Sequence, residues 1–125
     1  WYQRRVRGTF HMPCAIVQAN IKLDEEQSKK FIAEFSKTLA EALGKPEQYC
    51  MVGYQYSQMM FGGSDKPCAF IQLSSIGNIT PSNNSKAAKL LSTVIVQHLQ
   101  IDASRIYINF TDVKANNWGF NGTTF

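Results

Sequence analysis

The most regular pattern in the chain is an apolar repeat at helical spacing. Between residues 24 and 43, apolar side chains recur every three or four positions, and lysines and glutamates occupy most of the others. Asp24 and Gln27 have the spacing of a capping box, and a glycine and then a proline follow the last apolar position. The pattern predicts a helix over 24–43, and a similar repeat predicts another over 80–99.

Four shorter segments have the length and apolar content of strands. Turn-forming residues bound them, and the last segment alternates apolar and polar side chains. The predicted strands are 13–20, 49–56, 68–75 and 105–113. Together with the helices they give the order strand, helix, strand, strand, helix, strand, in which one βαβ unit repeats after about 55 residues.

Two such units predict the fold class. A βαβ crossover is right-handed and places its helix against one face of the sheet. The chain is therefore expected to be an α+β protein, with two βαβ repeats forming a four-stranded mixed sheet and two helices on one face. The other face would be bare, although the strands supply large apolar residues to both faces. A bare apolar face favours self-association.

The composition is that of one globular domain. A chain of 125 residues has room for one core, and 44% hydrophobic content excludes disorder. No apolar run approaches the roughly 20 residues of a spanning helix, which argues against a membrane partner. The net charge of +4 depends on three arginines within 1–11, because the other ten basic residues nearly balance the nine acidic ones. A nearly neutral body argues against nucleic-acid binding.

The first eleven residues are interpreted as an extension added by cloning. Residues 1–11 lack the apolar core of a signal peptide, and Met12 after His11 is typical of a native start. A natural basic arm is the alternative interpretation. A native domain over 12–125 without a signal peptide is expected to be made in the cytoplasm.

The three cysteines indicate neither a disulfide framework nor a metal site. Cys14, Cys50 and Cys68 are odd in number and have no CxxC spacing. They are expected to serve as small apolar residues on strands. The sequence predicts no metal and no cofactor.

Several motifs occur in register along the chain from Met12 to Phe125. They are Met12-Pro13, Gly44-Lys45-Pro46-Glu47-Gln48-Tyr49, Phe61-Gly62-Gly63-Ser64, Pro67-Cys68-Ala69, Ser75-Ile76-Gly77, Arg105-Ile106-Tyr107-Ile108-Asn109-Phe110, Asn116-Asn117-Trp118-Gly119-Phe120 and Thr124-Phe125. Together they resemble the macrophage migration inhibitory factor family of the tautomerase superfamily. The resemblance implies a homotrimer with a site at each subunit boundary. It also implies an isomerase, a keto–enol tautomerase of phenylpyruvate-type substrates, which are small aromatic 2-keto acids.

The resemblance assigns the catalytic role to Pro13. In this family the initiator methionine is removed, and the exposed proline amine is the general base. An ordinary α-amine has a pKa of about 7.7–8, and burial among apolar groups lowers it. Such a base can move a proton between the α-carbon of a ketone and its oxygen. Taken alone, Pro13 is more typical of a strand start than of a catalytic residue. If residues 1–11 remain attached, the Pro13 nitrogen is a tertiary amide, and the chain is expected to be inactive, with the extension lying across the pocket if it is ordered.

The resemblance also implies residues that bind the substrate. Lys45 would hold the substrate carboxylate, and the backbone of Ile76 would contact the same end. Tyr107 and Asn109 alternate onto one face of the last strand and would donate hydrogen bonds from the neighbouring subunit. The aromatic walls would be Tyr49, Trp118 and Phe120. In isolation, these are ordinary residue types for a helix end, a sheet face and a core.

Three positions depart from the family pattern. Ile71 stands where the animal cytokine has the second cysteine of a CxxC motif, so thiol–disulfide oxidoreductase activity is not expected. Asn78 replaces a lysine near the pocket mouth, and Cys14 follows the proline where an apolar residue is more usual. The alternative function is that of a secreted cytokine-like binding protein, which would leave the cell without a signal peptide, bind a cell-surface receptor and keep only a vestigial pocket.

Overall fold

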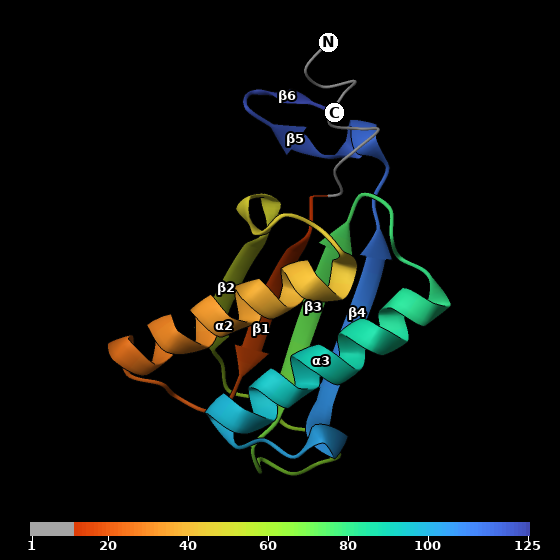
Figure 1. Cartoon of the computed structure of the whole chain (residues 1–125). Helices are drawn as coiled ribbons and strands as arrows, with labels where there is room; N and C mark the ends of the chain where they lie inside the picture. Colours follow the sequence, from red (N-terminus) through yellow and green to blue (C-terminus); the bar gives the residue numbers. More distant parts are fainter. Residues whose placement is uncertain (1–11) are drawn as a thin grey trace.

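The computed structural model describes residues 12–125, which form a four-stranded sheet with two helices against one face (Figure 1). The main elements are β1 (Cys14–Ala19), α2 (Glu25–Leu43), β2 (Met51–Tyr56), β3 (Ala69–Ser75), α3 (Pro81–Leu99) and β4 (Ile106–Asp112). They confirm the predicted α+β class and the predicted order. The expected extension over 1–11, and its position relative to any pocket, lie outside the described residues.

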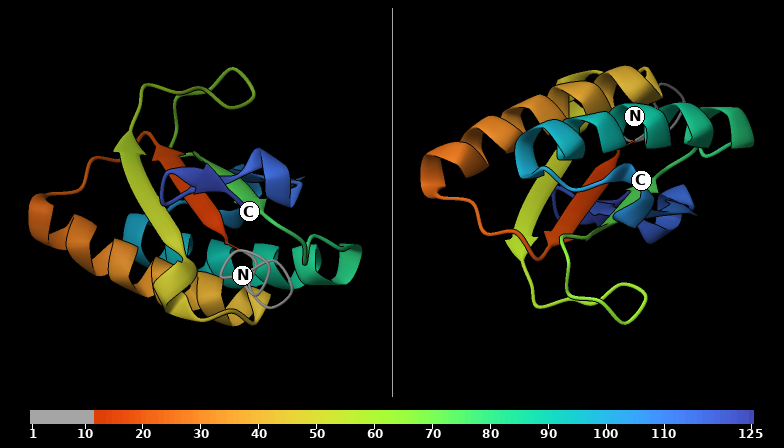
Figure 2. Two further views of the ribbon diagram at one scale, coloured as in Figure 1. Left: turned by 90° about the horizontal axis from the view of Figure 1, so that it is seen from above. Right: turned by 90° about the horizontal axis from the view of Figure 1, so that it is seen from below.

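The strand order in the sheet is β2-β1-β3-β4. β1 is parallel to β2, and β3 is parallel to β4, as each βαβ unit requires. The two central strands, β1 and β3, are antiparallel. The mixed sheet is therefore two βαβ units placed side by side, and Figure 2 shows α2 and α3 on the same side of it.

The helix ends follow the local sequence signals. The Asp24 carboxylate accepts a hydrogen bond from the Gln27 backbone at 2.7 Å, and the Gln27 side chain accepts one from the Asp24 backbone at 3.1 Å. Gly44 ends α2 with a left-handed φ of 64°, which a residue without a Cβ adopts at no steric cost. α3 begins with Pro81 in its first turn after a Thr80 cap. These ends fix where the chain leaves each helix.

Alternate residues of the central strands point toward the helices and form the core. Ala15 and Val17 of β1 and Ile71 and Leu73 of β3 are essentially inaccessible to solvent. The helices cover them with large side chains, which include Phe31, Phe35, Leu39, Leu91 and Ile95. Because side chains alternate along a strand, the residues between these core positions lie on the open face.

The open face of the sheet mixes apolar and polar side chains. Large apolar residues reach it as predicted, and Met51 and Tyr107 are 66% and 64% exposed. β4 sends its isoleucines and Phe110 to the helix side. On the open face, amide side chains of neighbouring strands therefore lie between the exposed apolar residues. The open-face amides are Gln18, Gln55, Gln72 and Asn109.

No helix among residues 12–125 is long and apolar enough to cross a membrane.

The C-terminal tail forms a small hairpin for which the sequence analysis predicted no element. A 3-10 turn over Ala115–Asn117 leads into β5 (Gly119–Phe120) and β6 (Thr123–Thr124). Asn121 and Gly122 both have positive φ, at 54° and 79°, as a tight hairpin turn requires. The hairpin lies beyond the end of the sheet where β1 begins (Figure 1).

Candidate functional site

A pocket of about 260 Å³ lies at this end of the sheet. The start of β1, the segment that enters β2 and the C-terminal hairpin form its walls. The lining residues are Met12, Pro13, Cys14, Gln48, Tyr49, Cys50, Met51, Trp118, Gly119 and Phe120. The structure therefore brings four of the predicted site residues to one pocket: Pro13, Tyr49, Trp118 and Phe120.

Pro13 lies at the buried edge of this pocket. Its side chain is less than 2% exposed, and its carbonyl accepts a hydrogen bond from the Met51 backbone at 3.0 Å. This bond belongs to the first pair of the β1–β2 ladder, Cys14 with Met51, and it fixes the start of β1. Burial of this kind disfavours an ammonium ion, so it would lower the pKa of a free amine at Pro13. In the present sequence Met12 acylates that nitrogen, and an amide nitrogen cannot act as a base.

Met12 is itself part of the pocket, which the sequence analysis did not predict. It is 5% exposed and forms a buried cluster with Ile76 and Phe125, flanked by Tyr49 and Trp118. The Met12 side chain thus fills apolar space between the loop of Ile76 and the C-terminal hairpin.

The hairpin forms an aromatic wall. The rings of Phe120 and Phe125 stack with centroids 5.3 Å apart and an interplanar angle of 11°. The Phe125 backbone donates a hydrogen bond to the Trp118 carbonyl at 3.2 Å, which closes the tail on itself. Phe125 is 1% exposed. The wall is therefore fixed by ring stacking and by a main-chain bond.

Lys45 and Ile76 lie on two segments that are joined beside the pocket. The Asn78 side chain donates a hydrogen bond to the carbonyl of Leu43, near the end of α2, at 2.9 Å. Lys45 follows this helix end, and Ile76 lies two residues before Asn78. Partial burial lowers the pKa of the Lys45 ammonium from its ordinary value. Lys45 is not among the described residues that line the pocket, although it lies on the segment that leads into it.

Tyr107 and Asn109 lie on β4, two strands away from the strand that follows Pro13. The register places Tyr107 beside Phe70, and Phe70 beside Gln18, which is five positions after Pro13 on β1. Two strand spacings across the sheet and five residues along it put Tyr107 about 20 Å from Pro13. A single chain therefore does not bring together all the residues predicted for the site.

Asn78 has a structural role in this region. Its φ of 62° is left-handed, a conformation that asparagine tolerates better than most residues. Its carbonyl accepts a hydrogen bond from the Asn83 side chain at 3.0 Å, in addition to the bond that it donates to Leu43. The residue thus joins the β3–α3 loop to both helices.

Two of the three free cysteines line the pocket. Burial raises the pKa of the Cys14 thiol. Burial, and then the nearby Glu47 carboxylate, raise the pKa of Cys50 to about 11. These thiols are therefore protonated near neutral pH and are weak nucleophiles. No group of three or more potential metal ligands occurs among residues 12–125.

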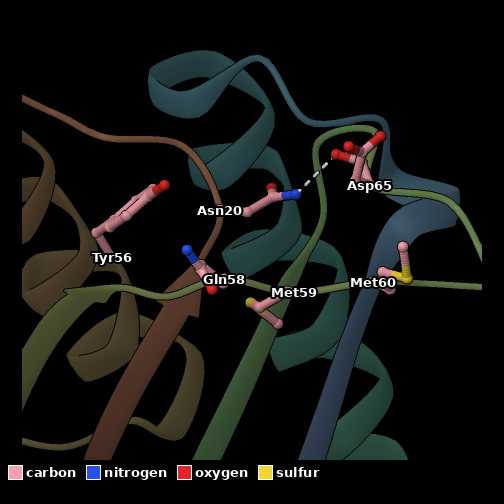
Figure 3. A pocket seen from close by; sticks show the side chains of 6 residues that line it. All are labelled: Asn20, Tyr56, Gln58, Met59, Met60 and Asp65. Carbon is pink, nitrogen blue, oxygen red and sulfur yellow. Dashed lines mark hydrogen bonds between the residues drawn. The ribbon is translucent and has the colours of Figure 1, made fainter.

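A second, more open pocket of about 520 Å³ lies at the opposite end of β1, lined in part by Tyr56, Met59 and Met60 (Figure 3). The amide of Asn20 donates hydrogen bonds to the Asp65 and Lys66 carbonyls at 3.0 and 3.1 Å. Its oxygen accepts a bond from the Cys68 backbone at 2.8 Å. Asn20 therefore serves the adjacent loop, and Figure 3 shows its bond to Asp65 at the rim of the pocket.

Comparisons with known proteins agree over the whole described chain. The family model described as macrophage migration inhibitory factor matches residues 12–125. A macrophage migration inhibitory factor homolog of Brugia malayi is 39% identical over 115 residues, covering 91% of this chain and 99% of that protein. The macrophage migration inhibitory factor of Mus musculus is 40% identical with the same coverage. The solved structure of macrophage migration inhibitory factor from Toxoplasma gondii has a TM-score of 0.86 at 40% identity, covering 90% of this chain and 99% of that one. The chain therefore belongs to the macrophage migration inhibitory factor family.

Proposed function

We propose that the protein, in a form that begins at Pro13, is a keto–enol tautomerase of small aromatic 2-keto acids such as phenylpyruvate. The observation that carries this proposal is the buried Pro13 at the edge of an aromatic-walled pocket, in a chain of this family. Removal of Met12 would convert the Pro13 nitrogen from an amide to a secondary amine inside an apolar site. Burial would keep much of that amine unprotonated near neutral pH.

The chemistry is a proton transfer in two parts. The Pro13 amine takes a proton from the carbon next to the ketone, and the electron pair of that C–H bond forms the enolate. The resulting ammonium then delivers the proton to the enolate oxygen, which gives the enol and restores the amine. The reverse sequence returns the keto form, so the reaction needs no cofactor.

The proposed substrate orientation rests on the pocket walls and on the segments beside them. Tyr49, Trp118 and Phe120 would contact the aromatic ring, since they supply the apolar walls. Lys45 and the backbone of Ile76 would bind the carboxylate from the adjoining segments. An ammonium in a partly buried position attracts a carboxylate more strongly than one in bulk water.

Tyr107 and Asn109 would complete the site from a neighbouring subunit of a homotrimer. Two features support this arrangement: the strand register puts Tyr107 about 20 Å from Pro13 in its own chain, and the sheet face that carries both residues is open. There the Tyr107 hydroxyl and the Asn109 amide would donate hydrogen bonds to the substrate.

The cloning origin of residues 1–11, which lie outside the family match, stays a prediction.

The test is the rate of phenylpyruvate tautomerisation by the chain that begins at Pro13, by its Pro13→Gly variant, and by the chain that keeps Met12. A general base contributes about 10²–10⁴-fold to a rate. We expect Pro13→Gly to lose at least 100-fold, and the chain with Met12 to lose as much. Full activity in both would overturn the assignment of the base.

A second candidate function is that of a cytokine-like ligand for a cell-surface receptor, which the name shared by its relatives favours. One fold can serve both roles. This role would need export of the protein from the cell. Receptor-dependent cell responses that persist in Pro13→Gly, together with no tautomerase activity in the chain that begins at Pro13, would favour this function over the enzyme.

A further inference from the structure

The loop between β2 and β3 is held by the side chain of Arg105. Its Nε donates to the Pro67 carbonyl at 2.9 Å, and its Nη1 donates to the Phe61 carbonyl at 3.3 Å. Its Nη2 donates to the carbonyls of Ser64 and Lys66, both at 3.1 Å. One guanidinium thus binds four main-chain carbonyls of a single loop, which projects beyond the sheet in Figure 2.

The loop has little regular structure to hold it otherwise. Its tip is a tight turn in which Gly62 and Gly63 have φ of 61° and 75°, closed by two backbone bonds between Phe61 and Ser64. Asn20 binds the loop from the other side, as described for the second pocket. The two side chains therefore fix the path of the 61–67 segment (hereafter the Arg105 loop).

Phe61 connects the Arg105 loop to Tyr107. The guanidinium carbon of Arg105 is 5.2 Å from the centroid of the Phe61 ring. The Phe61 ring in turn lies 4.7 Å from the Tyr107 ring at an interplanar angle of 48°. Tyr107 is otherwise mostly exposed on the open face of the sheet. The ring of Phe61 therefore limits the orientations that the Tyr107 side chain can adopt.

We propose that Arg105 is a positioning residue: by holding its loop and Phe61, it fixes the Tyr107 ring for hydrogen bonding in the neighbouring subunit's pocket. The inference rests on the proposed function. Arginine suits this role because its planar fork carries five N–H donors, whereas lysine has a single nitrogen. A displacement of about 1 Å at a catalytic group can cost up to 10²-fold in rate.

The first test is a double-mutant cycle in the chain that begins at Pro13. Arg105→Lys keeps the charge but cannot reach four carbonyls, and we expect it to lower kcat about tenfold. If Arg105 acts through Tyr107, the double variant Arg105→Lys/Tyr107→Phe is no slower than Tyr107→Phe alone. A purely structural role would instead make the two losses multiply.

The matched control is Lys22→Ala, which removes a cation–aromatic contact with Tyr56, 5.9 Å from the ring centroid, without touching Phe61. It should leave kcat unchanged.

The second test mixes subunits. Arg105→Lys chains keep Pro13, and Pro13→Gly chains keep an intact Tyr107. Where the two chains meet, one boundary combines the Pro13 of the Arg105→Lys chain with the Tyr107 and native Arg105 of the Pro13→Gly chain. The activity of reassembled mixtures should therefore exceed the summed activity of the separate variants. Absence of recovery in mixtures shown to have exchanged subunits would overturn the action across the boundary.

The outcomes separate this inference from the proposed function. Native kcat in Arg105→Lys, with a loss in Tyr107→Phe, overturns the role of Arg105 and leaves the function standing. Native kcat in both Tyr107→Phe and Pro13→Gly removes the proposed function itself. If Arg105→Lys does not fold, Phe61→Leu tests the same contact while leaving all four Arg105 bonds to the main chain in place. It should show the same coupling to Tyr107.

Discussion

Met12 occupies apolar space beside Pro13, so its removal should change stability as well as chemistry. The side chain is 5% exposed and packs with Ile76 and Phe125. Burial of a methionine side chain contributes about 1.5–3 kcal/mol. A chain that begins at Pro13 should therefore have a free energy of unfolding lower by about that amount than a chain that begins at Met12, measured by urea denaturation.

The space that Met12 vacates adjoins the site proposed for the aromatic 2-keto acid. A ligand present at 100 times its Kd stabilises the folded state by about 2.7 kcal/mol, which is close to the loss. We expect phenylpyruvate to raise the urea midpoint of the chain that begins at Pro13. Phenylpyruvate should leave the urea midpoint of the chain with Met12 unchanged, since the Met12 side chain fills that space.

Met12→Ala in the chain that keeps residue 12 separates the steric effect from the chemical one. It opens the pocket but leaves the Pro13 nitrogen as an amide. We expect this variant to bind phenylpyruvate, seen as a raised midpoint, with no turnover. Equal stabilisation of the Met12 and Pro13 chains by the ligand would refute the argument that the ligand needs the space that Met12 fills.

Asn78, Cys50 and Lys45 lie in or near the pocket, and each can be tested by one measurement. Asn78→Ala should lower the free energy of unfolding by about 2 kcal/mol, because it loses the bond to Leu43 and places alanine at a left-handed φ. Asn78→Gly should recover the backbone part, and equal stability of all three chains would contradict this. Cys50, with a pKa of about 11, should react with N-ethylmaleimide far more slowly at pH 7 than in the urea-unfolded chain, and the rate should rise with pH. Equal rates would contradict its burial. Burial lowers the pKa of Lys45, so its attraction for a substrate carboxylate is present below that pKa and lost as pH rises through it. In the parent chain, the KM for phenylpyruvate should therefore begin to rise at a pH below 10.5, the ordinary pKa of lysine. An identical rise in Lys45→Gln would count against this role of Lys45.

The helices and the βαβ order could be predicted because their signals are local. The capping box of Asp24 and the repeat over 24–43 specify α2 without reference to the rest of the chain. The handedness of the crossovers then places both helices on one face. The C-terminal hairpin was missed although Asn121-Gly122 is a typical signal for its turn, because each of its strands has only two residues.

The site could be predicted only in part, since most of its walls depend on strand register. Pairing of Cys14 with Met51 brings the entry to β2, and with it Cys50, beside Pro13. The predicted βαβ order already implied parallel pairing of these two strands, and that pairing produces this contact. The separation of Tyr107 from Pro13 follows from the strand order and not from any motif. The contacts of Arg105 depend on an irregular loop, for which the sequence has no periodic pattern.

The most direct test of the central claim is the pKa of the Pro13 nitrogen in the chain that begins there, measured by ¹⁵N NMR titration. The pocket predicts a value below the about 7.7–8 of an ordinary α-amine, because burial disfavours the ammonium. The activity should rise with pH through the same value. An amine pKa at or above the ordinary range, in a folded chain, would contradict the account of Pro13 as the catalytic base.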